Sequence, residues 1–200
     1  DKGFDFLQLL NDDLDLDLDV LRLFLSRANS SKIYEVLVGK CIDPQTGCVT
    51  YGALKRKSRI SKLHFTLLEN KDDVAITMNG NCVLIPEAII SKVGNLDRRF
   101  SHSFGDIDYG LRIKSAGYMI SEFELPLGFS EYNKEWVSHN LKLNFGTWQK
   151  ILCDPKGIPV REWLIFCYRH GGVFWPLNFF LRYFKLTLNN FRFNKTFAQL

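Results

Sequence analysis

The chain has 200 residues, of which 46% are hydrophobic and 24% are charged. This composition excludes a disordered protein and suits one globular domain, with or without an extension. The net charge of +4 is uneven, because residues 141–200 hold nine basic and two acidic residues and so carry +7, which leaves −3 for residues 1–140. Five cysteines without a CxxC pair argue against a disulfide framework and a structural zinc site, and predict a reducing, cytoplasmic setting.

The first third of the chain predicts one strand and one helix. Residues 4–10 form a short apolar run that predicts a buried strand, and this run ends in the acidic loop at 11–13. The apolar spacing at 20–28 predicts a helix. Residues 29–62 are mixed in pattern, and we predict only turns there, followed by a basic loop at 54–62.

Strands and helices alternate in the prediction for the rest of the chain. Strands are predicted at 74–78, 82–85 and 118–125, and helices at 86–94 and 106–117. The first two of these strands are joined by a predicted turn, Asn79-Gly80-Asn81. From about residue 134 the sequence becomes helical and basic, most strongly at 161–170 and 176–188. This mixture predicts an α/β fold with a three-layer sheet, in which ligands sit beyond the carboxyl ends of the strands.

The first acidic cluster follows the first predicted strand. An EF-hand loop that starts at Asp13 would need glycine and glutamate where the chain has Leu18 and Phe24, so calcium binding of that type is excluded. The alternating acids at 15, 17 and 19 indicate a solvated face. Asn11-Asp12-Asp13 differ, since carboxylates at a strand end can hold a divalent cation that binds a diphosphate.

The second acidic cluster, Gly105-Asp106-Ile107-Asp108, begins a predicted helix. Asp106 suits a helix cap, since a carboxylate there accepts hydrogen bonds from free N–H groups. Asp108 and Arg112 have the i,i+4 spacing of a helical ion pair. A carboxylate at a helix N-terminus also suits a general base, so capping and catalysis are both open for Asp106.

Three segments in this order resemble the family 2 glycosyltransferases: the predicted strand that ends in LLNDD, then ITMNGNCVLIPEAIISKVGNLDRRF, then FGDIDYGLRIKSAGY. The resemblance covers about residues 1–135. It implies a partial GT-A fold, a Rossmann-like three-layer α/β sheet, followed by a C-terminal helical, basic and aromatic tail. It also implies an inverting transferase that uses a nucleotide-sugar donor.

The resemblance assigns roles to both acidic clusters. Asp13, assisted by Asp12 or Asn11, matches the metal-binding acid and implies Mg²⁺ or Mn²⁺. In the second cluster, alignment on Arg112 puts Asp106 at the catalytic base and Asp108 at the second acid. Gly105 stands where the family often has glutamate, which leaves Asp108 as the other candidate for the base. Met78, Asn79 and Gly80 match the segment that lines the acceptor side of the pocket.

The beginning of the chain departs from the family. The family has a βαβ unit for the nucleotide before the acidic loop, and here only ten residues precede it. We therefore expect the chain to lack an N-terminal nucleotide-binding part, with residues 1–135 as the catalytic, acceptor-side part and residues 136–200 as an amphipathic helical extension.

Two functions follow from these observations. The first is transfer of a sugar to a glycan or lipid-linked acceptor in cell-surface polysaccharide synthesis, at the inner face of the cell membrane. The alternative is a truncated, non-catalytic module that binds the membrane surface. The basic, aromatic tail is either a helix pair packed on the sheet or an interfacial helix on anionic lipid. Nucleic acid is not expected as a partner, because no recognition motif accompanies the charge.

Overall fold

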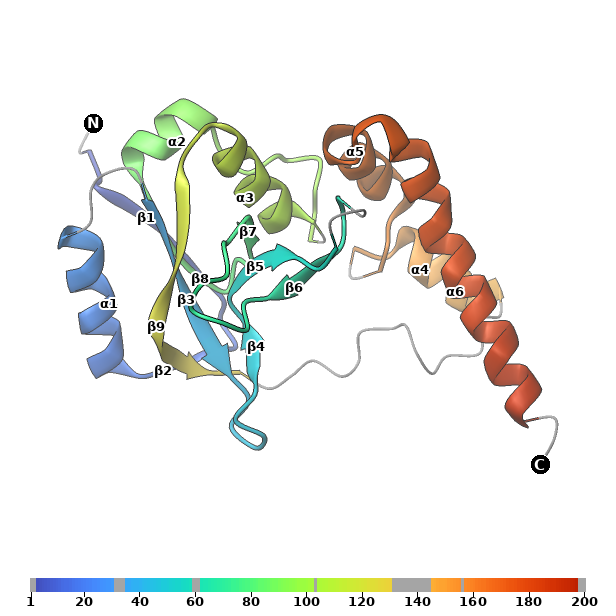
Figure 1. Ribbon diagram of the computed structural model, residues 1–200, viewed down its shortest axis with the longest axis horizontal. Helices are drawn as coiled ribbons and strands as arrows, with labels where there is room; N and C mark the ends of the chain where they lie inside the picture. The colour runs from blue at the N-terminus through green and yellow to red at the C-terminus, as the bar shows by residue number, and fades with distance from the viewer. Residues whose placement is uncertain are drawn as a thin grey trace. The chain divides into compact units, whose positions relative to one another are not determined.

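The chain folds into two units, shown in the computed structural model of Figure 1. The first consists of residues 1–97 and 106–132, and the second of residues 98–105 and 133–200. The structure describes residues 3–30, 35–58, 62–102, 104–130, 145–155 and 157–197. The predicted boundary between 135 and 136 and the predicted start of the helical tail at 134 fall outside these described residues.

A mixed, six-stranded sheet forms the centre of the first unit, in the order β1-β8-β3-β9-β2, with β4 paired to β3 outside this order. Strands β3 and β9 pair in parallel, and the other neighbours are antiparallel. The strands are β1 (Phe6–Leu10), β2 (Asp15–Leu16), β3 (Glu35–Ile42), β4 (Val49–Tyr51), β8 (Cys82–Pro86) and β9 (Met119–Phe129). The strand predicted at 82–85 is confirmed as β8. The strand predicted at 4–10 is present as β1, but it begins at Phe6 and is half-buried to exposed, not buried as predicted. Strands β3 and β4 were missed.

One face of this sheet is covered by α1 (Leu18–Ser30), which extends the helix predicted at 20–28. Phe24 and Ala28 of α1 pack with Leu37, Leu84 and Leu127 from three strands. Successive residues of a strand point to opposite faces. The residues next to Leu37 and Leu84 in the sequence therefore point to the other face of the sheet, where they belong to a second core.

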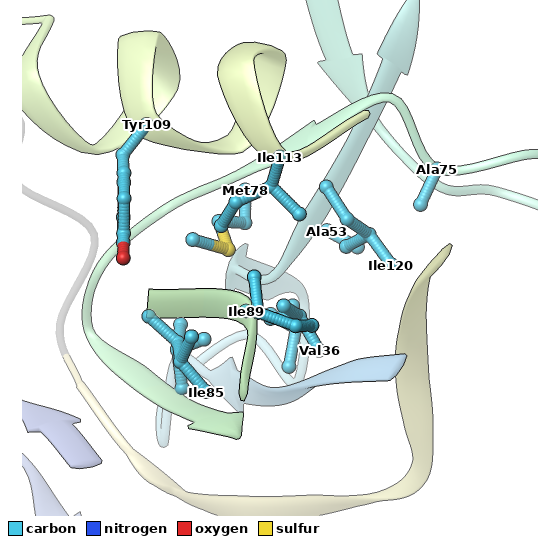
Figure 2. Close-up of a cluster of buried hydrophobic side chains, with 11 residues drawn as sticks. Val36, Ala53, Ala75, Met78, Ile85, Ile89, Tyr109, Ile113 and Ile120 are labelled. Atoms are coloured by element: carbon cyan, nitrogen blue, oxygen red, sulfur yellow. The ribbon is translucent and has the colours of Figure 1, made fainter. Parts of the chain in front are cut away.

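The second core lies between the sheet and two helices, α2 (Glu87–Val93) and α3 (Gly105–Ser115). Ile89 of α2 and Ile113 of α3 belong to the same buried cluster as Val36 and Ile85 of the sheet, and Figure 2 shows these side chains converging. With helices on both faces, the first unit is an α/β fold, as predicted.

Asp17 begins α1. Its Oδ1 accepts hydrogen bonds from the backbone N–H groups of Asp19 (3.0 Å) and Val20 (3.1 Å), which is the geometry of a helix N-cap. Asp15, Asp17 and Asp19 are all exposed, so the solvated face predicted for these acids is confirmed, and Asp17 has the added role of a cap.

A second, three-stranded sheet has the order β6-β5-β7. It consists of β5 (Ala53–Arg56), β6 (Phe65–Leu67) and β7 (Thr77–Met78). The basic loop predicted from residue 54 is therefore wrong for residues 54–56. Lys55 fits a strand because its ammonium group pairs with the carboxylates of Asp73 at 2.7 Å and Glu69 at 3.3 Å.

Strand β9 is longer than predicted. It continues through Pro126 to Phe129, although the prediction ended it at residue 125. Its pairing with β3 shifts register on both sides of Lys40, whose partner is Pro126. Proline lacks a backbone N–H, and an irregular point of the ladder is where a strand tolerates it.

The second unit is helical within the described ranges. It contains α4 (Phe145–Cys153), α5 (Val160–His170), the 3-10 helix η1 (Gly172–Phe174) and α6 (Trp175–Phe197), and the helices predicted at 161–170 and 176–188 are confirmed. The ring of Phe104, from the segment 98–105, stacks on Phe166 of α5 at a centroid distance of 5.2 Å and lies tilted against Trp163 at 5.3 Å. This segment belongs to the helical unit although its sequence neighbours belong to the α/β unit.

Candidate functional site

The turn Asn79-Gly80-Asn81 lies at the centre of the candidate site. It joins β7 of the small sheet to β8 of the large sheet. The N–H of Asn79 donates to the carbonyl of Gly52 at 3.0 Å, which fixes the start of the turn. The turn predicted here is confirmed, and its backbone groups hold both acidic clusters in place.

The first cluster is attached to this turn through the backbone. Strands β1 and β8 pair up to Leu10 and Cys82, and the N–H of Asn11 then donates to the carbonyl of Asn81 at 2.9 Å. Asp12 and Asp13 follow in a turn and are exposed to solvent. Both carboxylates are therefore displayed at the end of β1, beside the Asn79-Gly80-Asn81 turn.

The second cluster is attached to the same turn through a side chain. Asp106 is the second residue of α3, and its Oδ2 accepts the N–H of Gly80 at 2.9 Å. Its Oδ1 accepts the N–H of Ile107 at 2.7 Å. A Cβ at Gly80 would lie 3.2 Å from the Cβ of Asp106, which is closer than side chains normally pack. Glycine at position 80 thus lets the turn approach Asp106, and the turn orients its carboxylate.

Asp108 has a different environment. Its side chain is 0% exposed, and its Oδ2 accepts a hydrogen bond from Nε of Arg112 at 2.9 Å. Arg112 also donates to the carbonyls of Val93 at 3.1 Å and Asn95 at 2.8 Å. The predicted i,i+4 ion pair is confirmed, and it joins α3 to the end of α2.

Two residues that the prediction missed hold α3 against β7. The hydroxyl of Thr77 donates to the carbonyl of Ile107 at 2.8 Å. A Cβ at Gly110 would overlap Oγ1 of Thr77 and lie 2.9 Å from its Cα, so only glycine allows this close approach. A glycine inside a predicted helix was the available signal, since it is costly there without a packing reason.

The residues matched to the acceptor side differ in exposure. Met78 is 0% exposed and belongs to the core cluster, as Figure 2 shows, so its side chain cannot line a pocket in this structure. Asn79 and Gly80 are half-buried, and their contact with an acceptor stays a prediction. Asn81 is buried, and within the described part of the chain its Nδ2 has no hydrogen-bond partner.

Metal binding depends on Asp12 and Asp13. Among the described residues, no group of three or more His, Cys, Asp or Glu side chains is arranged to hold a metal ion. Mg²⁺ usually binds one or two carboxylates together with substrate phosphates and water, rather than a cage made only of protein. Two exposed neighbouring carboxylates therefore fit an ion that a diphosphate brings, and they do not fit a structural metal site.

Cys41, near the end of β3, lies close enough to the loop at residues 11–13 for the charge of Asp13 to act on its thiol. Burial raises the pKa of the Cys41 thiol from 9.0 to about 12, with smaller contributions from Cys82 and from the charge of Asp13. Burial likewise raises the pKa of Cys82 to about 11. Burial therefore disfavours the thiolate form of both cysteines.

No protein-family model matches the sequence, and no curated protein matches it significantly. The resemblance to family 2 glycosyltransferases therefore stays a prediction.

Proposed function

We propose that this chain acts in inverting sugar transfer, with a GT-A-type α/β fold similar to family 2, and takes the sugar from a nucleotide-diphosphate donor. One observation carries the proposal. The Asn79-Gly80-Asn81 turn donates to Asp106 and accepts from Asn11, so two acidic clusters about ninety residues apart are joined to one turn. A general base and a diphosphate-binding carboxylate pair are the two parts that inverting transfer needs.

Asp106 is the general base in this proposal. Its carboxylate is oriented by two N–H donors, from Gly80 and Ile107, and its side chain is only half-buried. It takes the proton from the acceptor hydroxyl while the hydroxyl oxygen bonds to the anomeric carbon and the bond from that carbon to the diphosphate breaks. The attack comes from the face opposite the diphosphate, so the configuration inverts. Positioned base catalysis of this kind is worth about 10²–10⁴ in rate.

The remaining residues bind or position. Asp13 and Asp12 would hold Mg²⁺ or Mn²⁺, which when bound neutralises charge on the departing diphosphate. Asp108 is completely buried against Arg112, so it is a positioning residue that fixes α3 and not the base. The biological setting we propose is cell-surface polysaccharide synthesis at the cytoplasmic face of the membrane.

The test compares two aspartate variants of the complete protein in a nucleoside-diphosphate release assay. The donors are UDP-, GDP- and dTDP-sugars with Mn²⁺. We expect Asp106→Asn to lower turnover about 10²–10⁴-fold while Mn²⁺–UDP binding and the melting temperature stay close to wild type. Asp19→Asn, an exposed aspartate of α1, is the matched control and should keep full activity. Unchanged turnover of Asp106→Asn would remove Asp106 from the proposed role.

A wild-type protein that binds none of the nucleoside diphosphates with Mn²⁺ and releases none from any donor would favour the second function. In that case the chain is a non-catalytic module that acts at a membrane surface. The observation that favours this alternative is the composition of α6, which includes many exposed aromatic and aliphatic side chains.

A further inference from the structure

Helix α6 has one face that is fixed within the second unit. The indole N–H of Trp163 donates to the carbonyl of Phe179 at 3.2 Å, and the hydroxyl of Tyr183 donates to the carbonyl of Ile158 at 3.1 Å. The guanidinium of Arg182 lies over the Trp163 ring, 4.7 Å from its centroid. These contacts set the rotation of α6 about its own axis and decide which side chains point away from α5.

The opposite face is apolar and exposed. Phe180 is 67% exposed and Phe184 58% exposed, and the other members of this row lie three or four positions away, which places them on one side of a helix. Isolated exposed apolar residues are normal, but a continuous row of them marks a surface that another body covers. We call this row the apolar stripe, formed by Leu177, Phe180, Leu181, Phe184 and Leu188.

The charge of α6 has one sign. The sequence 175–197 contains Arg182, Lys185, Arg192 and Lys195 and no acidic residue. Lys185 is exposed and lies beside the stripe, because it is four positions after Leu181 and three before Leu188. Arg182 lies over the Trp163 ring on the other side of α6, so Lys185 is the basic residue that the structure places beside the row. An apolar row with a positive charge beside it is complementary to a surface that offers hydrocarbon below a layer of negative charge.

We propose that the apolar stripe docks on the surface of an anionic lipid bilayer, with α6 lying in the plane of the interface. Within the described ranges, no helix has both the length and the apolarity to cross a membrane, so α6 would lie on the bilayer and not span it. Interfacial helices have this arrangement of aromatic and aliphatic side chains on one face and basic residues beside them.

A second copy of the chain is a less favourable occupant. A two-fold symmetric contact would place the same stripe on both partners, which brings the positive charges of two α6 helices together. No acidic residue of α6 could offset them. An anionic bilayer uses both the apolar row and the charge. The proposal does not depend on sugar transfer, because no residue of the α/β unit contributes to it.

The experiment measures the partitioning of the complete protein onto two kinds of vesicle, phosphatidylcholine alone and phosphatidylcholine with phosphatidylglycerol. We expect binding to the second kind, weakened by added salt. Leu177→Gln/Phe184→Gln should weaken it about tenfold or more, because two apolar side chains no longer enter the interface. The matched control is Leu18→Gln/Leu23→Gln, two equally exposed leucines of α1, which should bind as wild type does.

The charge is tested separately. Lys185→Gln should weaken binding to phosphatidylglycerol vesicles about fivefold, the ratio that corresponds to about 1 kcal/mol per basic residue at an anionic surface. Binding to phosphatidylcholine alone should not change. Lys92→Gln, an exposed lysine of α2, is its control. Far-UV circular dichroism of each variant checks that the helices are retained.

Three results would overturn the proposal. The first is a wild-type protein that does not bind phosphatidylglycerol vesicles. The second is a Leu177→Gln/Phe184→Gln variant that is folded and binds them as tightly as wild type. The third is light scattering that shows a dimer for the wild-type protein and a monomer for the Leu177→Gln/Phe184→Gln variant, with no vesicle binding by either protein. The stripe would then be a self-association surface. Asp106→Asn should leave vesicle binding unchanged, which separates this test from that of sugar transfer.

Discussion

Replacement of Asp108 by asparagine tests the division of roles between the two aspartates of α3. In the native protein the carboxylate of Asp108 is completely buried and lies 2.9 Å from Nε of Arg112. Removal of one charge from a buried ion pair costs about 3–5 kcal/mol, because the other charge is left without its partner. Arg112 keeps two carbonyl acceptors, Val93 and Asn95, and an asparagine oxygen can still accept from Nε. We therefore expect a loss of about 2–4 kcal/mol.

Asp106→Asn is predicted to behave differently. Its side chain is half-buried, and two N–H groups, of Gly80 and Ile107, donate to its carboxylate. An asparagine amide has one oxygen in place of two, so one of these N–H groups loses its acceptor. This loss should lower the free energy of unfolding by about 1 kcal/mol. The proposed sugar transfer, by contrast, should fall about 10²–10⁴-fold in Asp106→Asn.

The assay is thermal unfolding followed by circular dichroism. For a protein of this size, a loss of about 2–4 kcal/mol lowers the melting temperature by about 5–15 °C. The control is Asp19→Asn, which removes an exposed carboxylate that lies 2.9 Å from an arginine of the same helix and should change stability by less than about 0.5 kcal/mol. A melting temperature of Asp108→Asn equal to that of Asp19→Asn would refute the structural role of the buried pair.

Two further predictions concern packing and pH. In a urea titration, Gly110→Ala should lower the free energy of unfolding by about 1–3 kcal/mol, because its Cβ would meet the backbone of Thr77 at 2.9 Å. The control is Gly3→Ala, which should be neutral because no atom lies within 4 Å of its Cβ. Burial raises the pKa of the thiols of Cys41 and Cys167 from 9.0 to about 12 and that of Cys82 to about 11. Above about pH 9 the unfolded chain releases these protons and the native protein does not, so stability should fall as the pH rises towards 11–12. Equal urea midpoints at about pH 8 and about pH 10 would contradict this, and Cys41→Ala should reduce the difference.

The sequence was informative where a local rule determines the structure. Pro86 and Gly94 enclose α2, whose last backbone bond runs from the N–H of Gly94 to the carbonyl of Ile90, as the helix-end preferences predict. The i,i+4 spacing of Asp108 and Arg112 likewise predicted a contact that forms within one helix. In both cases the partners are a few residues apart, so no knowledge of the tertiary fold was needed.

Strand β3 shows where local rules fail. It lies at the centre of the sheet, where apolar side chains point to both faces and the alternation of a half-buried strand is absent. Gly39 and Lys40 interrupt its apolar run. Glycine is needed at 39 because a Cβ there would overlap the side chain of Leu127, and Lys40 lies 3.9 Å from the carboxylate of Glu122. Both reasons involve residues more than eighty positions away.

The candidate site has the same limit. Position alone suggested that Asp106 could cap α3, but Asp106 is the second residue of the helix. Its carboxylate accepts the N–H of the adjacent Ile107 and the N–H of Gly80, which lies 26 residues earlier. That donor decides where the carboxylate points, because the N–H of Ile107 is part of the same helix and would be present in any orientation of α3. The direction of the proposed base is thus determined by the turn between β7 and β8.

This dependence has a consequence for the chemistry of the site. Asn81 of the same turn accepts the N–H of Asn11, so a displacement of the turn would move the proposed base and the proposed diphosphate-binding loop together. Thr77, directly before the turn in β7, donates to the carbonyl of Ile107, which couples α3 to the same backbone. Hydrogen bonds to one short segment therefore fix the proposed base relative to the proposed diphosphate-binding loop. In-line displacement requires such a fixed arrangement, because the hydroxyl oxygen, the anomeric carbon and the departing oxygen must lie on one line when the bond breaks.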